Sequence, residues 1–177
     1  MLKVFTLAVM LVFFSACSQK ENVKPTHATS KHKQMKKMQK HTKMFQTVAK
    51  KDAILVQEGK NKNSCAICGM NLTKFYKTSH IVVHEDKPVQ YCSLHCLADH
   101  LGEGVEVKNP KVVDVKSLKF IPVLEAYYVV GSDVHGTMSR VSKYAFQNLE
   151  DAKKFQKLHG GKIMDFYGAL EKAKEDF

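Results

Sequence analysis

Two close pairs of cysteines are the residues of this sequence best suited to chemistry. Each pair spans about one turn of chain, and enough sequence for a β-hairpin separates the pairs, so four sulfur atoms can converge on one point. The pairs and the methionine that follows the first of them are Cys65, Cys68, Met70, Cys92 and Cys96. Thiolates beside a thioether are the ligands that a soft ion such as Cu(I) prefers. The sequence therefore predicts a metal site built from sulfur.

Other uses of four cysteines stay open on the residues alone. Two structural disulfides would suit an oxidising compartment, and Cys-x2-Cys followed by Cys-x3-Cys is also typical of a small zinc site. A thioredoxin-type redox pair is a third option, although that motif normally opens a helix, whereas Cys68 is followed by Gly69 and a loop. We rank metal binding above disulfides and disulfides above redox catalysis, with zinc and copper close to even.

Two methionines shift this ranking towards copper. Met70 lies beside the first cysteine pair, and Met138 lies in a glycine-containing loop at the matching place in the second half of the chain. A methionine in such a loop is harder to explain by core packing than one in a helix. If the two halves pack about a pseudo-twofold axis, these methionines face one another across the interface. His135, three residues before Met138, is a candidate imidazole ligand.

Turn signals and β-branched runs predict the elements that position these residues. Residues 47–58 are expected to enter the domain as a strand or short helix. The first half should then contain strands at residues 77–84, 88–91 and 105–115, with a helix that Ser93 caps and that ends near Leu101. The second half repeats this order with strands at residues 124–130, 142–146 and 162–166, a helix opened by Asn148 or Glu150, and a last helix over about 167–174.

This order predicts an α+β fold of two ββαβ-like units packed as a pseudo-repeat. We expect the first unit, with the cysteine pairs, over residues 47–115 and the second over residues 116–177. Residues 1–17 have one lysine and then an apolar run too short to span a bilayer, the pattern of a secretory signal peptide. The fold should therefore follow a cleaved leader and a flexible tether.

The end of the leader suggests a lipid anchor. Residues 14–17, Phe-Ser-Ala-Cys, resemble a bacterial lipobox, in which Cys17 becomes the lipidated first residue of the mature protein. Plain cleavage or an uncleaved anchor are the alternatives, because phenylalanine is unusual at the first lipobox position. Residue 18 is serine rather than the acidic residue that often retains lipoproteins at the inner membrane. The periplasmic side of the outer membrane is therefore slightly favoured.

Residues 18–46 should form a basic tether. The formal net charge is +11, and residues 20–62 hold twelve lysines against three acidic residues. Charge on a tail beside a lipid anchor suits anionic headgroups, and an export signal argues against a nucleic-acid partner. The tether and its edge also carry possible secondary metal ligands, namely Met35, Met38, His41 and Met44. Such spacings arise easily in lysine-rich low-complexity sequence, so a plain linker is favoured about two to one.

An ordered set of motifs from Ser64 to Phe166 resembles the NosL family, lipoproteins known as nitrous-oxide-reductase accessory proteins. With Cys17, the matching pieces are Cys65-x-x-Cys68-Gly69-Met70, Tyr91-Cys92-Ser93, Tyr128-Val129-Val130-Gly131-Ser132, His135-Gly136-Thr137-Met138, Phe155 and His159-Gly160-Gly161. The resemblance implies two ββαβ units, Cu(I) binding, and delivery of copper to the reductase in the periplasm. By matching position it implies Cys68, Met70 and Met138 as soft ligands. This chain has Cys65, Cys92 and Cys96 in addition to the cysteine of the simpler family members, and these thiols resemble those of YHS- and TRASH-type metal-trafficking modules.

The predicted function is a membrane-anchored Cu(I) chaperone and not an enzyme, with a periplasmic cuproenzyme, nitrous oxide reductase, as its acceptor. No paired carboxylates, phosphate loop or Ser/His/Asp arrangement stands out in the sequence. The alternatives are a zinc-stabilised binding module and a thiol-disulfide oxidoreductase that uses Cys65 and Cys68.

Overall fold

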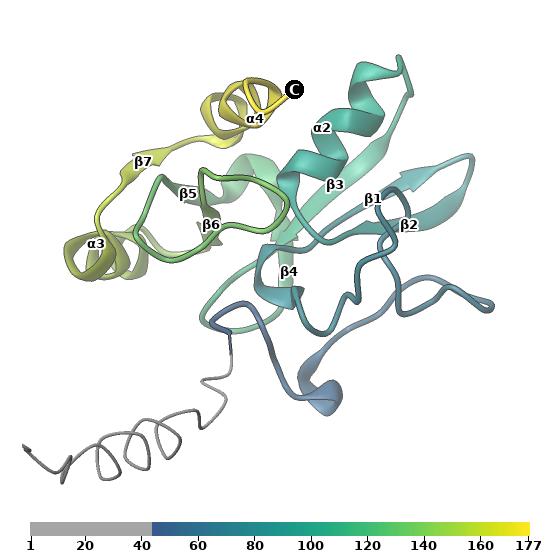
Figure 1. Ribbon diagram of the computed structural model, residues 1–177, viewed down its shortest axis with the longest axis horizontal. Helices are drawn as coiled ribbons and strands as arrows, with labels where there is room; N and C mark the ends of the chain where they lie inside the picture. Colours follow the sequence, from purple (N-terminus) through teal and green to yellow (C-terminus); the bar gives the residue numbers. More distant parts are fainter. Residues whose placement is uncertain (1–43) are drawn as a thin grey trace, which may run out of the picture. The chain divides into compact units, whose positions relative to one another are not determined.

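The computed structural model describes residues 44–177, which contain three α-helices and two antiparallel sheets (Figure 1). The expected signal peptide, Cys17 and most of the tether, with Met35, Met38 and His41, lie outside the described residues. No helix in the described part of the chain is long and apolar enough to cross a membrane.

The first unit is a four-stranded sheet in the spatial order β2-β1-β3-β4. Its one α-helix lies between β2 and β3 in the sequence. Its elements are β1 (His80–His84), β2 (Lys87–Tyr91), α2 (Leu94–Gly102), β3 (Lys108–Val113) and β4 (Phe120–Pro122). Glu85 and Asp86 connect β1 to β2 with positive φ angles of 48° and 57°. These angles are those of a two-residue hairpin turn whose twist matches that of the strands. The hairpin pairs His80 with Tyr91, so the chain enters α2 beside the start of β1.

The second unit repeats this order around a three-stranded sheet, β6-β5-β7. Its elements are β5 (Tyr127–Val130), β6 (Lys143–Phe146), α3 (Leu149–His159), β7 (Lys162–Met164) and the additional helix α4 (Phe166–Lys174). Acidic residues in the first turn of α3 and basic residues in its last turn complement the helix dipole. Gly160 ends α3 with a φ of 70°, a conformation that glycine adopts without strain.

The predicted α+β fold of two ββαβ units is confirmed, and the differences are local. Residues 76–78 form a 3-10 turn, η2 (Tyr76–Thr78), so β1 begins at His80. Another 3-10 turn, η3 (Val123–Glu125), shortens β5 in the same way. Within residues 47–58 the only helix or strand is the 3-10 turn η1 (Lys50–Asp52). Strand β4 was not expected, and its pairing with β3 carries the first sheet past residue 115.

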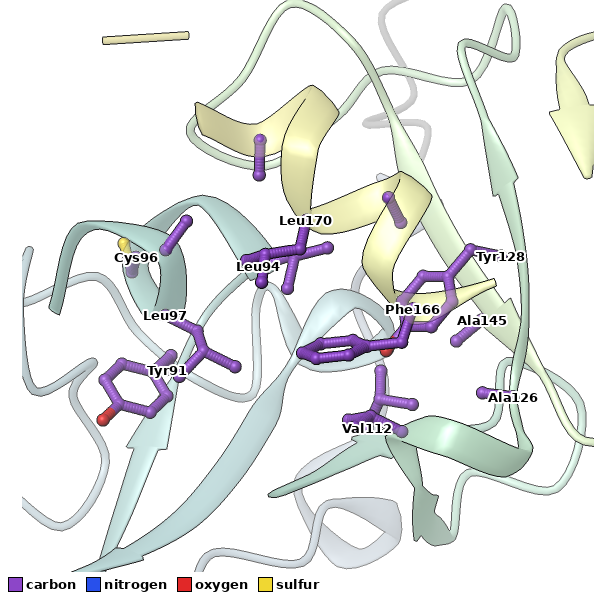
Figure 2. Close-up of a cluster of buried hydrophobic side chains, with 14 of the residues drawn as sticks. Tyr91, Leu94, Cys96, Leu97, Val112, Ala126, Tyr128, Ala145, Phe166 and Leu170 are labelled. Atoms are coloured by element: carbon purple, nitrogen blue, oxygen red, sulfur yellow. The ribbon is translucent and has the colours of Figure 1, made fainter. Parts of the chain in front are cut away.

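One apolar core runs through both units (Figure 2). From the first unit it takes Tyr91, Leu94, Leu97 and Val112, and from the second unit Tyr128, Ala145, Phe166 and Leu170. Helix α4 packs against α2, as Figure 1 also shows. Each large side chain buried here contributes roughly 1.5–3 kcal/mol relative to leaving it exposed. The units are therefore held together by the same core that supports α2.

Candidate metal centre

The structure brings the four sulfur atoms of Cys65, Cys68, Cys92 and Cys96 within 4.8 Å of one another. The Cys68 and Cys92 sulfurs are 3.4 Å apart, and those of Cys92 and Cys96 are 3.7 Å apart. All four cysteines are free thiols. A tetrahedral ion with metal–sulfur bonds of about 2.3 Å would separate its ligands by about 3.8 Å. The thiols are therefore already spaced for a single ion.

A tight turn positions the first pair. The N–H of Cys65 donates to the carbonyl of Met70 at 2.8 Å, and the N–H of Gly69 donates back to the carbonyl of Cys65 at 3.0 Å. Gly69 has a φ of 73°, and a Cβ atom built on it would meet no atom within 4 Å. Glycine is therefore required here for its backbone conformation and not for space.

The start of α2 positions the second pair. Cys92 directly follows β2, and Cys96 lies in the first turn of the helix. The side chain of Ser93 accepts a hydrogen bond from the N–H of Cys96 and caps the helix.

Hydrogen bonds among the thiols lower the pKa of one cysteine and raise the pKa of two others. Bonds from the Cys92 and Cys96 side chains, together with backbone N–H groups of Cys68 and Cys92, hold the pKa of Cys65 well below its ordinary value. The hydrogen bond to Cys65 raises the pKa of Cys92 and of Cys96, and burial raises them further. The metal-free cluster therefore favours a thiolate at Cys65 and thiols at Cys92 and Cys96.

The cluster has a closed side and an open side. Cys65, Cys92 and Cys96 are at most 3% exposed, whereas Cys68 is only partly buried. Beside the turn of the first pair lies a cavity of about 620 Å³, lined by Cys65, Ile67 and Gly69 and by residues 87–89 of β2. Cys65 lines this cavity and Cys68 does not, while Cys68 is the most exposed thiol of the cluster.

The predicted thioether ligands lie in different surroundings. Met70 is half-buried against the main core. Met138 is 42% exposed and has a φ of 58°, in the left-handed region that disfavours residues other than glycine and asparagine. Met44 is 40% exposed, and His135 is exposed, with its backbone carbonyl accepting hydrogen bonds from Gln46 and Tyr144. Metal binding by these four residues stays a prediction.

A buried pair of hydroxyls connects the Met138 loop to the cysteines. The Thr78 hydroxyl donates to the carbonyl of Cys92 at 2.7 Å, and it lies 2.8 Å from the hydroxyl of Thr137, the residue before Met138. Thr78 and Thr137 are 3% and 4% exposed. Neither threonine was predicted from the sequence, because nothing in their spacing indicates that two loops far apart in the chain meet.

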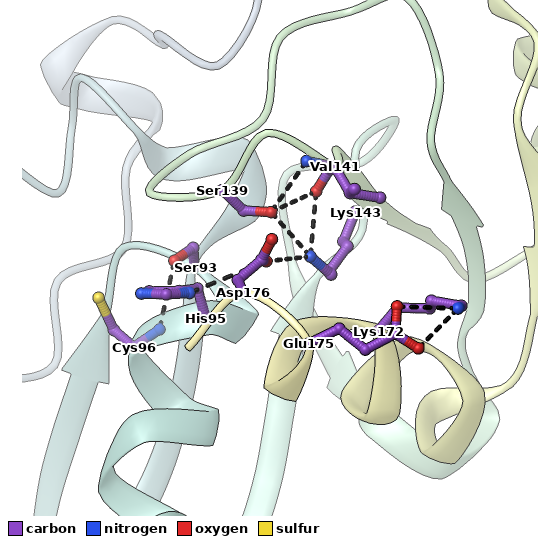
Figure 3. A network of polar contacts seen from close by, with 9 residues as sticks. All are labelled: Ser93, His95, Cys96, Ser139, Val141, Lys143, Lys172, Glu175 and Asp176. Carbon is purple, nitrogen blue, oxygen red and sulfur yellow. Dashed lines mark hydrogen bonds and ion pairs between the residues drawn. The ribbon is translucent and has the colours of Figure 1, made fainter.

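The sequence between Cys92 and Cys96 also contributes to a polar network on another side of α2 (Figure 3). Nδ1 of His95 lies 3.9 Å from a carboxylate oxygen of Asp176, and its ring stacks on Phe177 at 4.4 Å. The same carboxylate accepts a hydrogen bond from the buried Nζ of Lys143 at 3.0 Å. Burial lowers the pKa of Lys143, while the Asp176 carboxylate opposes that shift. His95 is therefore part of this network, and no group of metal-ligating side chains that includes it was found in residues 44–177.

The fold and the site define a two-unit α+β protein with a mostly buried four-thiol cluster. The family model described as NosL matches residues 56–172, and the chain belongs to that family. This confirms the resemblance inferred from the motifs.

Two relatives show how far the similarity extends. The copper-binding lipoprotein NosL of Stutzerimonas stutzeri is 27% identical over 121 residues, covering 60% of this chain and 61% of the relative. The chain thus matches about three fifths of that relative's length. The crystal structure of the copper chaperone NosL from Shewanella denitrificans matches with a TM-score of 0.52 and 24% identity, over 63% of this chain and 92% of that one. Neither relative is named as an enzyme, in agreement with the predicted binding function.

Proposed function

We propose that this chain is a Cu(I) chaperone, anchored to the periplasmic side of a bacterial membrane, that delivers copper to nitrous oxide reductase. The observation that carries the proposal is the set of four free thiols within 4.8 Å, one of them partly exposed. Sulfur ligands select Cu(I) over harder ions. The names of the two relatives, both of them copper proteins, support the choice of metal.

The unequal burial of the thiols suggests how copper is released. Cys65, Cys92 and Cys96 would hold the ion from the protein side, and Cys68 would be the first ligand to be replaced. A soft ligand of the acceptor bonds to the ion as the bond to Cys68 breaks. Copper remains Cu(I) throughout this exchange, so no oxidant or reductant is needed. The cavity beside Cys65 and Ile67 offers room for an approaching segment of the acceptor.

Loading the site requires the loss of protons. Hydrogen bonding and burial raise the pKa of Cys92 and of Cys96, so both are thiols in the metal-free chain. Metal binds the thiolates, and it therefore competes with protons for them. Copper affinity is expected to fall as pH falls.

The remaining ligands of the proposal come from the family resemblance and from the tether. Met70 and Met138 would complete the soft ligand set from the two units, with His135 as an additional donor. Lipidated Cys17 and the lysines of residues 18–46 would hold the chain at the membrane. Met35, Met38, His41 and Met44 are the residues that would supply a weaker secondary site, against which a plain linker is favoured about two to one.

An anaerobic Cu(I) titration of the reduced chain against a strong chelator tests the ligand set. Cys68→Ser and Met138→Leu should each weaken binding, whereas Met164→Leu, which alters a half-buried methionine packed against the main core, should not. Unchanged affinity in both test variants would show that the proposed ligands are wrong. Transfer is tested by mixing the copper-loaded chain with metal-free reductase and following copper in each protein after separation.

A zinc-stabilised binding module is the second candidate, favoured by the burial of three thiols and by sulfur separations close to those of a tetrahedral zinc site. Zinc retained at one ion per chain, which Cu(I) does not displace, would favour it. The third candidate, a thiol-disulfide oxidoreductase, predicts catalytic turnover of dithiols that is lost in Cys65→Ser.

A further inference from the structure

Two histidines outside the thiol cluster lie side by side at one end of the first unit. His84 ends β1 and His100 lies in the last turn of α2, with ring centroids 5.3 Å apart and ring planes at 80°. Two imidazoles that bind one ion through nitrogens at about 2.0–2.1 Å have their centroids about 5 Å apart. We infer that His84 and His100 form a second metal site, of imidazole type, for a divalent transition ion.

The hydrogen bond of His84 prepares its other nitrogen for a metal. Nδ1 lies 3.1 Å from the backbone carbonyl of Glu106, which can only accept, so Nδ1 carries the proton. The lone pair is then on Nε2, which is free to coordinate an ion. Metal-binding histidines commonly donate their second ring nitrogen to a backbone carbonyl in this way. The His84 side chain is 29% exposed, so ions in solution can reach it.

His100 has a comparable partner in Tyr91. Its Nδ1 lies 2.8 Å from the Tyr91 hydroxyl. A hydroxyl can both donate and accept, so when a metal takes the lone pair of Nε2 the phenol oxygen of Tyr91 accepts a hydrogen bond from Nδ1–H of His100. Nε2 of His100 makes no hydrogen bond to any residue of the described part of the chain.

The two imidazoles decide the class of ion, and one carboxylate lies beside His84. A carboxylate oxygen of Glu85 lies 4.0 Å from Nε2 of His84, and the Glu85 side chain is 79% exposed and free to approach. Imidazole nitrogens suit borderline divalent ions, and among these Cu(II) binds most tightly. The thiol cluster instead suits a soft ion. The second site does not depend on the proposed chaperone function.

The test uses the full chain, in detergent, with His27, His32 and His41 of the tether replaced by glutamine so that they do not compete. The thiols are reduced and filled anaerobically with Cu(I), which has no paramagnetic resonance signal and which thiolates hold more tightly than Zn(II), and Cu(II) is then titrated and followed by electron paramagnetic resonance. We expect one further Cu(II) per chain, with hyperfine splitting from two nitrogens. His84→Gln and His100→Gln should each weaken this binding at least about tenfold and remove one nitrogen from the spectrum.

Two further variants test whether Cu(II) binds specifically at His84 and His100 and not at any accessible histidine. His159→Gln removes another accessible histidine, whose Nδ1 bonds to Asp133, and should change nothing. Tyr91→Phe removes only the partner of His100 and should weaken binding while both nitrogens remain in the spectrum. Binding that is unchanged in His84→Gln and His100→Gln, or a spectrum without nitrogen splitting, overturns the proposal. A separate Cu(I) titration of the thiols reports on the proposed function, so failure of one idea is distinguished from failure of the other.

Discussion

The two ββαβ units differ most at two matched positions. In the first unit the residue after the second strand is Cys92, and the residue four places later, in the first turn of the helix, is Cys96. In the second unit the corresponding residues, after β6 and in the first turn of α3, are Gln147 and Asp151. The same backbone therefore presents two thiols in one unit and an amide and a carboxylate in the other.

The second unit uses these positions for attachment to the rest of the chain. The N–H of Gln147 donates to the carboxylate of Asp114 at 3.1 Å, and Asp151 pairs with Lys116 at 2.9 Å. Asp114 and Lys116 lie in the segment that follows β3. One copy of the repeat thus directs these positions into a metal cluster, while the other directs them at the connection between the units. The strand–helix junction fixes where side chains point, and at the matched positions Cys96 and Asp151 the residue type decides the use.

The largest expected effect comes from removing a thiol at the junction of the first unit. Cys92→Ser should leave the chain without stoichiometrically bound metal at micromolar concentrations, because Cys92 is close to both Cys68 and Cys96. Gln147→Ser, the matched change in the second unit, should leave metal binding as it is. Metal analysis after gel filtration measures both. Retention of metal by Cys92→Ser would mean that the two junctions do not differ in the way proposed.

A second prediction concerns the contact between the first strands of the two units. His80 of β1 is 1% exposed, and its Nε2 lies 3.2 Å from the hydroxyl of Tyr128 on β5. Burial lowers the pKa of His80 to about 4, below the value of about 6.5 expected in the unfolded chain. Between these values the unfolded chain binds a proton that the folded chain does not, so stability is complete above pH 6.5 and falls as pH falls towards 4.

Urea unfolding of the metal-free reduced chain checks this prediction. His80 should account for a loss of about 2 kcal/mol in the free energy of unfolding between pH 7 and pH 5. His80→Gln should be less stable at pH 7 and should lose most of this dependence on pH. An equal loss in the variant and in the original chain would assign the effect to other groups.

A smaller effect is expected at the hydroxyls that join the Met138 loop to the cysteines. Thr137→Val leaves the Thr78 hydroxyl without one of its buried partners and should cost about 1–2 kcal/mol. Thr137→Ser keeps the hydroxyl and should cost less. If Met138 is a ligand, Thr137→Val should also weaken Cu(I) binding, because it frees the loop that holds the thioether. Equal Cu(I) affinities in the two variants would argue against that role.

Much of this fold could be predicted because it depends on local sequence patterns. The hairpin, the Ser93 cap and the glycines that end α3 each depend on a few neighbouring residues, and all lie close to where the sequence places them. The convergence of the four thiols also followed from their spacing. Strand β4 could not be predicted, since it has three residues, of which one, Ile121, is buried, and it exists only because β3 offers an edge.

What the sequence could not predict are contacts between distant segments. Thr78 and Thr137 are 59 residues apart, and the approach of His84 to His100 requires both the hairpin and the length of α2. Such pairs have no signature in composition or periodicity, because they depend on how elements pack. They are also the contacts that connect the two units or surround the cysteines, and site reasoning from sequence alone is weakest there.

The smallest expected effect on stability concerns the N-terminal caps of α2 and α3. Ser93 accepts a hydrogen bond from the N–H of Cys96, whereas Asn148, at the same place before α3, makes no capping bond with its side chain. Ser93→Ala should therefore cost about 1 kcal/mol of stability, as loss of a capping side chain usually does, and Asn148→Ala should cost only a few tenths. Urea unfolding of the metal-free chain measures both. Because Ser93 also fixes Cys96 in the first turn, Ser93→Ala should lower metal affinity as well, and equal stability losses in the two variants would remove the distinction between the junctions.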